Sequence, residues 1–175
     1  MSLNPTDALA RLKAGNEGFV AAPSAPTLEH RPFAVVLGCS DARVPPEIIF
    51  GQGPGDLFVV RVAGNVAGPT QLASIEFAVA ELGARLVVVL GHSECGAVRA
   101  ALQGAGSTER MPHLGSLTDP IRRAIAPRSG VGEAVRANVR AVVADVRRHL
   151  AGEDVVVAGA VYSLEKRAVE FIEDG

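Results

Sequence analysis

Short apolar runs alternate along this chain with stretches that have helical spacing. Runs of β-branched and aromatic residues predict strands at 33–37, 57–62, 86–90, 154–161 and 169–172. Apolar residues at helical spacing predict helices at 4–20, 69–82 and 135–150, and a further helix is expected to begin near Ser93. The strands are apolar along their whole length. This favours an α/β fold with a mainly parallel sheet of four to five strands, covered by helices on both faces.

Local residues set the expected ends of these helices. Asn4 can cap the first helix, with Pro5 at its first position. Gly83 and Gly152 are placed to end the helices before them. Segments rich in turn-forming residues are expected to hold loops, or at most a short helix, at 20–32, 45–56 and 104–115.

Composition and charge place the chain among ordinary globular proteins. Its 175 residues most simply form one domain, 1–175, and they are 48% hydrophobic and 21% charged. A net charge of −2 gives no reason to expect nucleic acid or a membrane surface as a partner. The N-terminus lacks the pattern of a signal peptide, and no apolar run reaches the roughly 20 residues that span a bilayer. We therefore expect a cytoplasmic protein.

Both cysteines of the chain follow predicted strands. Cys39 comes after the run 33–37 and a glycine, with Asp41 two residues later, and His92 and Cys95 follow the run 86–90. In a parallel sheet, ligands bind beyond the carboxyl ends of the strands, so we expect these four side chains at one mouth. In a cytoplasmic protein two cysteines are more often thiols, metal ligands or catalysts than a structural disulfide.

This set of side chains suits a metal ion. Thiolate and imidazole are the donors that Zn²⁺ prefers in a tetrahedral site. His92 and Cys95, three residues apart, are expected on one face of a first helical turn, and Cys39 supplies a third ligand if its strand is adjacent. Three protein ligands leave one position open, as in a catalytic zinc site. Asp41 could fill that position or accept a hydrogen bond from water in it, and Arg43 is spaced to grip the Asp41 carboxylate.

Each of these residues also has an ordinary structural interpretation. A cytosolic cysteine is often a small buried hydrophobe. His92 could form a hydrogen bond in the core, Asp41 could cap a helix, and Arg43 could be a surface cation. Their joint position at one predicted mouth favours metal binding over these interpretations. His113 and His149 have no comparable neighbours, and we expect both in solvent.

Two short motifs carry a family resemblance. They are Cys39-Ser40-Asp41-Ala42-Arg43 and His92-Ser93-Glu94-Cys95-Gly96, which together resemble the signature of the β-class carbonic anhydrases. Further similar segments are Gly15-Asn16-Glu17, Gly55-Asp56-Leu57-Phe58-Val59-Val60-Arg61, Ala63-Gly64-Asn65, Ser74-Ile75-Glu76-Phe77-Ala78 and Gly159-Ala160-Val161-Tyr162-Ser163-Leu164. The similarity runs along nearly the whole chain.

The resemblance implies an enzyme that reversibly converts CO2 and water into bicarbonate and a proton, using zinc-bound hydroxide. It implies zinc held by Cys39, His92 and Cys95, with Asp41 and Arg43 as a catalytic pair. In a closed resting form of the family the carboxylate, here Asp41, binds the zinc itself. The resemblance also implies a homodimer or homotetramer with the active site near the subunit interface.

Some positions depart from the family pattern. His30 stands where the family commonly has a glutamine that helps to orient substrate. It could donate a similar hydrogen bond or act as a proton acceptor. With Gly96 it is a candidate substrate contact. Val62 replaces a frequent asparagine, the connection 151–153 is short, and the turn ending at Arg167 lacks the usual Thr-Gly. A left-handed Arg167 there would cost about 1 kcal/mol.

Three other functions stay open at this point. A hydrolase of CS2 or COS on the same fold would use the same zinc ligands with a different access route. A cysteine nucleophile activated by His92 would need a free thiolate and no metal. A zinc closed by Asp41 would make a structural or regulatory domain, although such a site needs no switchable pair of Asp41 and Arg43. Metal content distinguishes the cysteine nucleophile from the other two functions. Activity distinguishes the structural or regulatory zinc domain from a carbonic anhydrase.

Overall fold

The computed structural model describes residues 5–20, 29–125 and 130–172. The elements in chain order are α1 (Pro5–Val20), β1 (Ala34–Gly38), α2 (Pro46–Phe50), β2 (Leu57–Arg61), the 3₁₀ turn η1 (Ala63–Asn65), α3 (Pro69–Ala80), β3 (Leu86–His92), α4 (Gly96–Leu102), α5 (Gly115–Ala124), α6 (Val131–His149), β4 (Val156–Ser163) and β5 (Ala168–Ile172). Among the described helices, none combines the length and apolar character needed to cross a bilayer.

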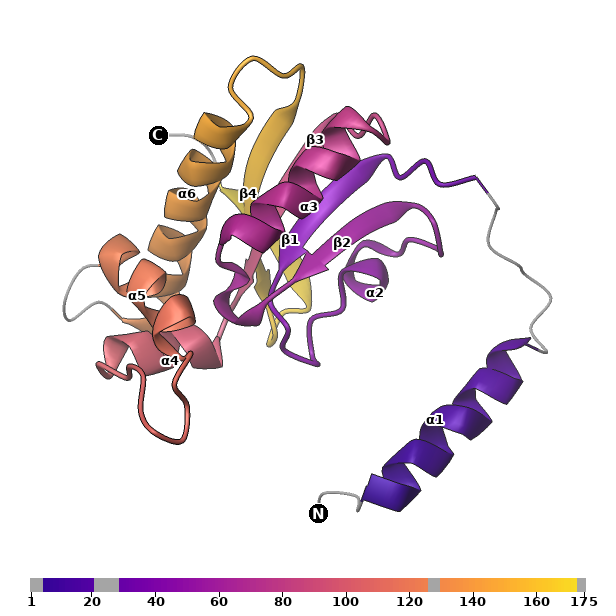
Figure 1. The fold of residues 1–175 in the computed structure, drawn as a ribbon, viewed down its shortest axis with the longest axis horizontal. Coiled ribbons are helices and arrows are strands. Elements are labelled where there is room, and N and C mark those ends of the chain that lie inside the picture. Colours follow the sequence, from indigo (N-terminus) through magenta and orange to yellow (C-terminus); the bar gives the residue numbers. More distant parts are fainter. Residues whose placement is uncertain (1–4, 21–28, 126–129, 173–175) are drawn as a thin grey trace.

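The five strands form one sheet in the order β2-β1-β3-β4-β5 (Figure 1). β1 pairs in parallel with both β2 and β3, and β3 pairs in parallel with β4, whereas β5 runs antiparallel to β4. Every residue of β1 is buried, as is every residue of β3 after the first. This accounts for their unbroken apolar runs. The expected α/β fold with a mainly parallel sheet is confirmed.

Helices α3 and α6 cover one face of this sheet. The core on that face includes Val35 and Leu37 of β1, Val87 and Val89 of β3, Ile75 and Val79 of α3, and Val139 and Val143 of α6. On the opposite face, α2 is the one described helix whose side chains join the core cluster of the strands. Phe33 and Phe171 line a cavity of about 200 Å³ on that face, and each is 56% exposed. Within the described residues, helices therefore lie on both faces as expected, but α2 covers its face only in part.

Two glycines let α6 pack closely against the sheet. A Cβ atom on Gly91 of β3 would lie 2.6 Å from a methyl carbon of Val139, and one on Gly159 of β4 would lie 3.0 Å from the other. No side chain fits at either distance without moving the helix or its neighbours. The position of α6 relative to β3 is thus fixed by contact between the Val139 side chain and the bare backbone at Gly91.

Several predicted boundaries differ from the structure. The prediction missed α5, which has Pro120 within it and a charged outer side, so few of its residues form an apolar pattern. The helix expected near Ser93 begins at Gly96, because β3 continues as far as His92. Arg167 has a φ of 55°, so the left-handed backbone considered for this turn is present. Asn4, most of the predicted loop at 20–32 and the end of the chain lie outside the described residues.

The close approach at Gly91 generates a first prediction. Gly91→Ala is expected to lower the free energy of unfolding by about 1–3 kcal/mol, because the added methyl group overpacks the contact with Val139. Gly132→Ala is the matched control. Gly132 lies in α6 with no atom near its would-be Cβ, so alanine there should change stability by less than about 1 kcal/mol. Urea unfolding measures both variants, and equal values for the two would contradict the packing argument.

Candidate metal centre

Three potential ligands meet at the carboxyl edge of the sheet. Cys39 directly follows β1, and His92 is the last residue of β3, the parallel neighbour of β1. Cys95 follows three residues after His92. The Sγ atoms of the two cysteines and a ring nitrogen of His92 all lie within 4.8 Å of one another, and all three residues are buried. The structure thus brings together the ligand set that the sequence predicted.

Cys95 reaches this cluster through a turn rather than from a helix that contains both ligands. The expectation that His92 and Cys95 share the first turn of a helix is wrong. Glu94 between them has a φ of 57°, in the left-handed region, and Cys95 is the N-cap residue of α4. The Ser93 hydroxyl accepts a hydrogen bond from the Leu164 backbone N–H at 2.9 Å, which ties this turn to the end of β4. The chain reversal therefore places Cys95 beside His92.

The imidazole of His92 is oriented for metal binding. Its Nδ1 lies 2.9 Å from the carbonyl oxygen of Ser93, a contact in which Nδ1–H donates. The proton on Nδ1 leaves a lone pair on Nε2. His92 is 1% exposed, and its Nε2 is buried without a hydrogen-bond partner in the described structure. A buried polar atom without a partner is costly, and a metal ion between the two sulfurs would satisfy it. The donor set fits zinc.

The two thiols interact strongly. The pKa of Cys39 is lowered, mainly by a hydrogen bond from the Cys95 thiol and further by the Gly64 backbone N–H, which lies 3.4 Å from Cys39 Sγ. The pKa of Cys95 is raised, because its thiol donates to Cys39 and is buried. Protein groups alone therefore favour one thiolate in this pair. A divalent cation adds the positive charge that stabilises two.

Asp41 and Arg43 form the predicted pair beside the cluster. Arg43 donates from Nε to Asp41 Oδ1 at 2.9 Å and from Nη2 to Oδ2 at 2.6 Å, and its backbone N–H also donates to Oδ1 at 2.9 Å. These bonds hold the pKa of Asp41 far below its usual range, so this carboxylate is ionised at neutral pH. Asp41 Oδ2 lies 3.9 Å from His92 Nε2. An ionised acceptor therefore lies next to the candidate metal position.

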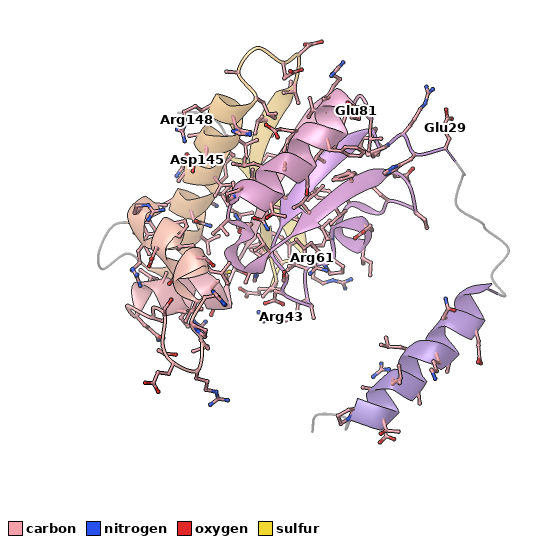
Figure 2. The ribbon with its side chains drawn as sticks, in the orientation of Figure 1. Glu29, Arg43, Arg61, Glu81, Asp145 and Arg148 are labelled. Atoms are coloured by element: carbon pink, nitrogen blue, oxygen red, sulfur yellow. The ribbon has the colours of Figure 1, made fainter. Side chains whose placement is uncertain are left out.

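Arg61 is a site residue to which the sequence assigned no role. It ends β2 and donates from Nε to the carbonyl oxygen of Cys39 at 2.9 Å and from Nη2 to that of Asp41 at 2.6 Å. Figure 2 shows Arg61 and Arg43 at the same edge of the sheet. The available signal was an arginine near the end of the predicted strand 57–62. Its position shows that one side chain fixes the loop carrying both a ligand and the carboxylate.

The two candidate substrate contacts lie in different places. His30 is exposed and stacks on Phe58, with 6.0 Å between the ring centroids. Phe58 pairs with Val35 near the start of β1, so the described chain does not bring His30 to its own Cys39. Gly96 is exposed directly after Cys95, and a Cβ there would meet no atom within 4 Å. Open space thus borders the cluster at Gly96, and both substrate roles stay predictions.

The remaining two histidines take no part in the cluster. His113 is exposed, as expected. His149 is also exposed, as expected, and its Nε2 lies 2.6 Å from Glu76 Oε1 on α3. Neither residue belongs to the group of potential metal ligands.

The sheet and the cluster together define a class: an α/β protein with a candidate two-cysteine, one-histidine metal centre at the carboxyl edge of its strands. A family model described as carbonic anhydrase matches residues 34–169. The chain is 40% identical to carbonic anhydrase 2 of Mycobacterium tuberculosis, over 93% of this chain and 90% of that protein. It is 49% identical to a carbonic anhydrase of Mycolicibacterium smegmatis, over 61% of this chain and 57% of that one. The chain belongs to the carbonic anhydrase family.

Solved structures identify the fold as that of the β class. The β-carbonic anhydrase CcaA matches with a TM-score of 0.79 and 24% identity, over 95% of this chain and 99% of that chain. CafA of Aspergillus fumigatus, also a β-carbonic anhydrase, matches with a TM-score of 0.69 and 29% identity, over 96% and 90%. Tetrameric β-carbonic anhydrases of Sordaria macrospora match with a TM-score of 0.75 and 24% identity, over 98% and 99%.

The Arg61 contacts generate a second prediction. Arg61→Met is expected to lower the free energy of unfolding of chelator-treated protein by about 1–3 kcal/mol, because two carbonyl groups lose charged donors. Arg148→Met is the control, since Arg148 pairs with Asp145, an exposed carboxylate one turn away, and its loss should change stability by less than about 1 kcal/mol. Urea unfolding with a chelator present isolates the protein's own contribution. An Arg61→Met variant as stable as the parent would contradict the role of Arg61 in holding the loop.

Proposed function

We propose that this protein is a zinc-dependent carbonic anhydrase that catalyses the reversible hydration of CO2 to bicarbonate and a proton. The observation that carries the proposal is the buried cluster of Cys39, His92 and Cys95, with the unpaired His92 Nε2 inside it and an ionised Asp41 beside it. Membership of the carbonic anhydrase family supports it. The three ligands leave a fourth position, as catalytic zinc sites do.

The residues around that position have separable roles. Cys39, His92 and Cys95 would hold the zinc. When bound, zinc supplies a nucleophile at neutral pH, because it lowers the pKa of water to about 7. Asp41 would accept a hydrogen bond from the attacking oxygen and so turn a lone pair of that oxygen towards CO2. Arg43 would hold the Asp41 carboxylate ionised and correctly aimed.

The contact between Asp41 and Arg43 supports an open fourth position. Both carboxylate oxygens of Asp41 accept hydrogen bonds from Arg43. To become a zinc ligand, the carboxylate would have to exchange at least one of these bonds for the metal. We infer that this arrangement is the catalytic one and that a closed site requires the pair to separate.

The alternatives receive less support from this geometry. A nucleophilic cysteine needs access to its substrate, yet Cys39 is 5% exposed and Cys95 is 1% exposed. A hydrolase of CS2 or COS would share the zinc ligands, so only assays with these substrates distinguish it from a carbonic anhydrase. A protein with a closed structural zinc would show no activity in any of these assays.

Exposed apolar side chains support a homodimer or homotetramer. Phe33 and Phe171 are each 56% exposed on the sheet face that carries α2, and Leu9 and Leu12 of α1 are 54% and 72% exposed. Association through such surfaces would remove them from water. The matched structures of Sordaria macrospora are described as tetrameric. We infer that a second copy of this chain covers these surfaces.

The first experiment is stopped-flow CO2 hydration by zinc-loaded protein. We expect catalysis that is abolished by a zinc chelator and that rises between about pH 7 and pH 9, because two thiolates make bound water less acidic than three histidines would. The pKa of Asp41 lies far below this range, so its titration does not contribute to the rise. His92→Ala should lose both zinc and rate, whereas His149→Ala, outside the cluster, should keep both. Stoichiometric zinc without any rate would contradict the proposal, and COS and CS2 would then be assayed.

A further prediction concerns the carboxylate. Asp41→Asn is expected to keep stoichiometric zinc but to lose about 10²-fold or more in rate, because an amide lacks the charge and acceptor geometry of the carboxylate. Metal analysis and the CO2 assay measure the two effects. The control is Asp145→Asn, an exposed residue of α6, which should leave zinc and rate unchanged. A fully active Asp41→Asn variant would disprove the role given to Asp41.

A further inference from the structure

A buried amide lies deep in α6 where apolar residues are expected. Asn138 is 2% exposed, and its neighbours along the buried face of α6 are alanine and valine. Its Nδ2 donates a hydrogen bond of 2.9 Å to the carbonyl oxygen of Gly64. Burying an amide costs free energy unless its polar atoms are paired, so this bond gives the asparagine a specific partner. That partner, Gly64, also contacts Cys39 of the candidate metal centre.

Gly64 makes a hydrogen bond on each side of its backbone. Its N–H donates to Cys39 Sγ at 3.4 Å, while its carbonyl accepts from Asn138. Its φ of 73° is left-handed, and a Cβ there would lie 2.7 Å from Ile121 Cδ1 and 3.1 Å from Ala97 Cβ. The backbone of Gly64 is therefore tightly enclosed, with Asn138 of α6 bonded to its carbonyl and Cys39 bonded to its N–H.

The helix that carries Asn138 is itself fixed relative to the cluster. Val139, the next residue, packs against Gly91 and Gly159 at distances that leave no room for a side chain. Gly91 directly precedes the ligand His92. The amide of Asn138 is thus held at a set position relative to β3, and through Gly64 it reaches the ligand that follows β1.

We propose that Asn138 is a positioning residue for the Cys39 thiolate, acting through the backbone of Gly64. The proposal rests on the proposed function insofar as the bound metal is zinc. Asn138 holds the Gly64 carbonyl, and the Gly64 N–H in turn fixes Cys39 Sγ and withdraws some of its negative charge. Hydrogen bonds behind metal ligands typically change metal affinity or activity by about 10–100-fold.

Metal binding by Asn138→Leu tests the proposal. Leucine has a similar size but no donor, so the Gly64 carbonyl loses its partner. We expect the zinc dissociation constant, measured by competition with a chelator, to rise about tenfold or more. We also expect the thiolate-to-metal absorption band of the cobalt-substituted protein to shift. Val142→Ala is the control, because Val142 is a buried residue on the same helix without a hydrogen bond to η1.

The outcomes separate positioning from simple destabilisation. Weaker zinc binding and a shifted cobalt band in Asn138→Leu, with neither change in Val142→Ala, would support the proposal. Unchanged affinity and band in Asn138→Leu would overturn it, as would equal changes in both variants. These readouts do not involve CO2, so a protein that binds zinc but fails to hydrate CO2 would refute the proposed function and leave this test intact.

A measurement on the unaltered protein covers the case in which Asn138→Leu does not fold. Protein labelled with the magnetically active isotopes of both nitrogen and carbon is loaded with a cadmium isotope that has a nuclear spin. A scalar coupling from the Gly64 amide proton to cadmium, together with one from the Asn138 side-chain nitrogen to the Gly64 carbonyl carbon, would support the chain of hydrogen bonds. If either coupling is absent while both signals are resolved, the proposal is wrong.

Discussion

The parallel pairing of β1 with β3 is the constraint on which the rest of the site depends. Gly38 is paired with Leu90, so Cys39 and His92 emerge from the sheet at the same edge. The buried strands themselves present only apolar side chains and glycine before this edge, so polar ligands can gather only where the strands end. The left-handed turn at Glu94 then returns the chain, and Cys95 completes the group. A different register would separate Cys39 from His92, and the three potential ligands would not meet.

Backbone groups hold much of the site in place. Arg61 binds the carbonyl oxygens of Cys39 and Asp41, Ser93 orients His92 through its carbonyl, and Gly64 donates to Cys39. These contacts fix peptide units rather than long side chains, so they lose little rotational freedom when metal binds. The close packing of Val139 of α6 against Gly91 also restricts the strand end that carries His92. The peptide units that carry the potential ligands are therefore held by contacts within the protein itself.

The candidate site holds two kinds of acidic group side by side, the buried cysteine thiols and the carboxylate of Asp41. The thiols of Cys39 and Cys95 are buried together and favour a cation between them, whereas the carboxylate of Asp41 is neutralised from outside by Arg43. An arginine on that carboxylate keeps it ionised without requiring the metal. Under the proposed function, this division would let the two cysteines and His92 hold zinc while Asp41 remains available to a reacting water. It is the arrangement that the proposed hydration of CO2 needs.

The sequence alone determined the class of fold and the identity of the potential ligands. Apolar runs and helical spacing follow from local burial, and the motifs at 39–43 and 92–96 lie within a few residues of strand ends. It did not reveal α5, whose apolar residues are few, nor the turn that delivers Cys95. It also did not show that α2 covers its face of the sheet only in part, because that depends on packing. Nor did it assign Arg61 or Asn138 a role, since Asn138 meets Gly64 across 74 positions. Only the tertiary structure decides such contacts, because hydrogen bonds form between neighbours in space, and the sheet register and the glycines beneath α6 choose those neighbours.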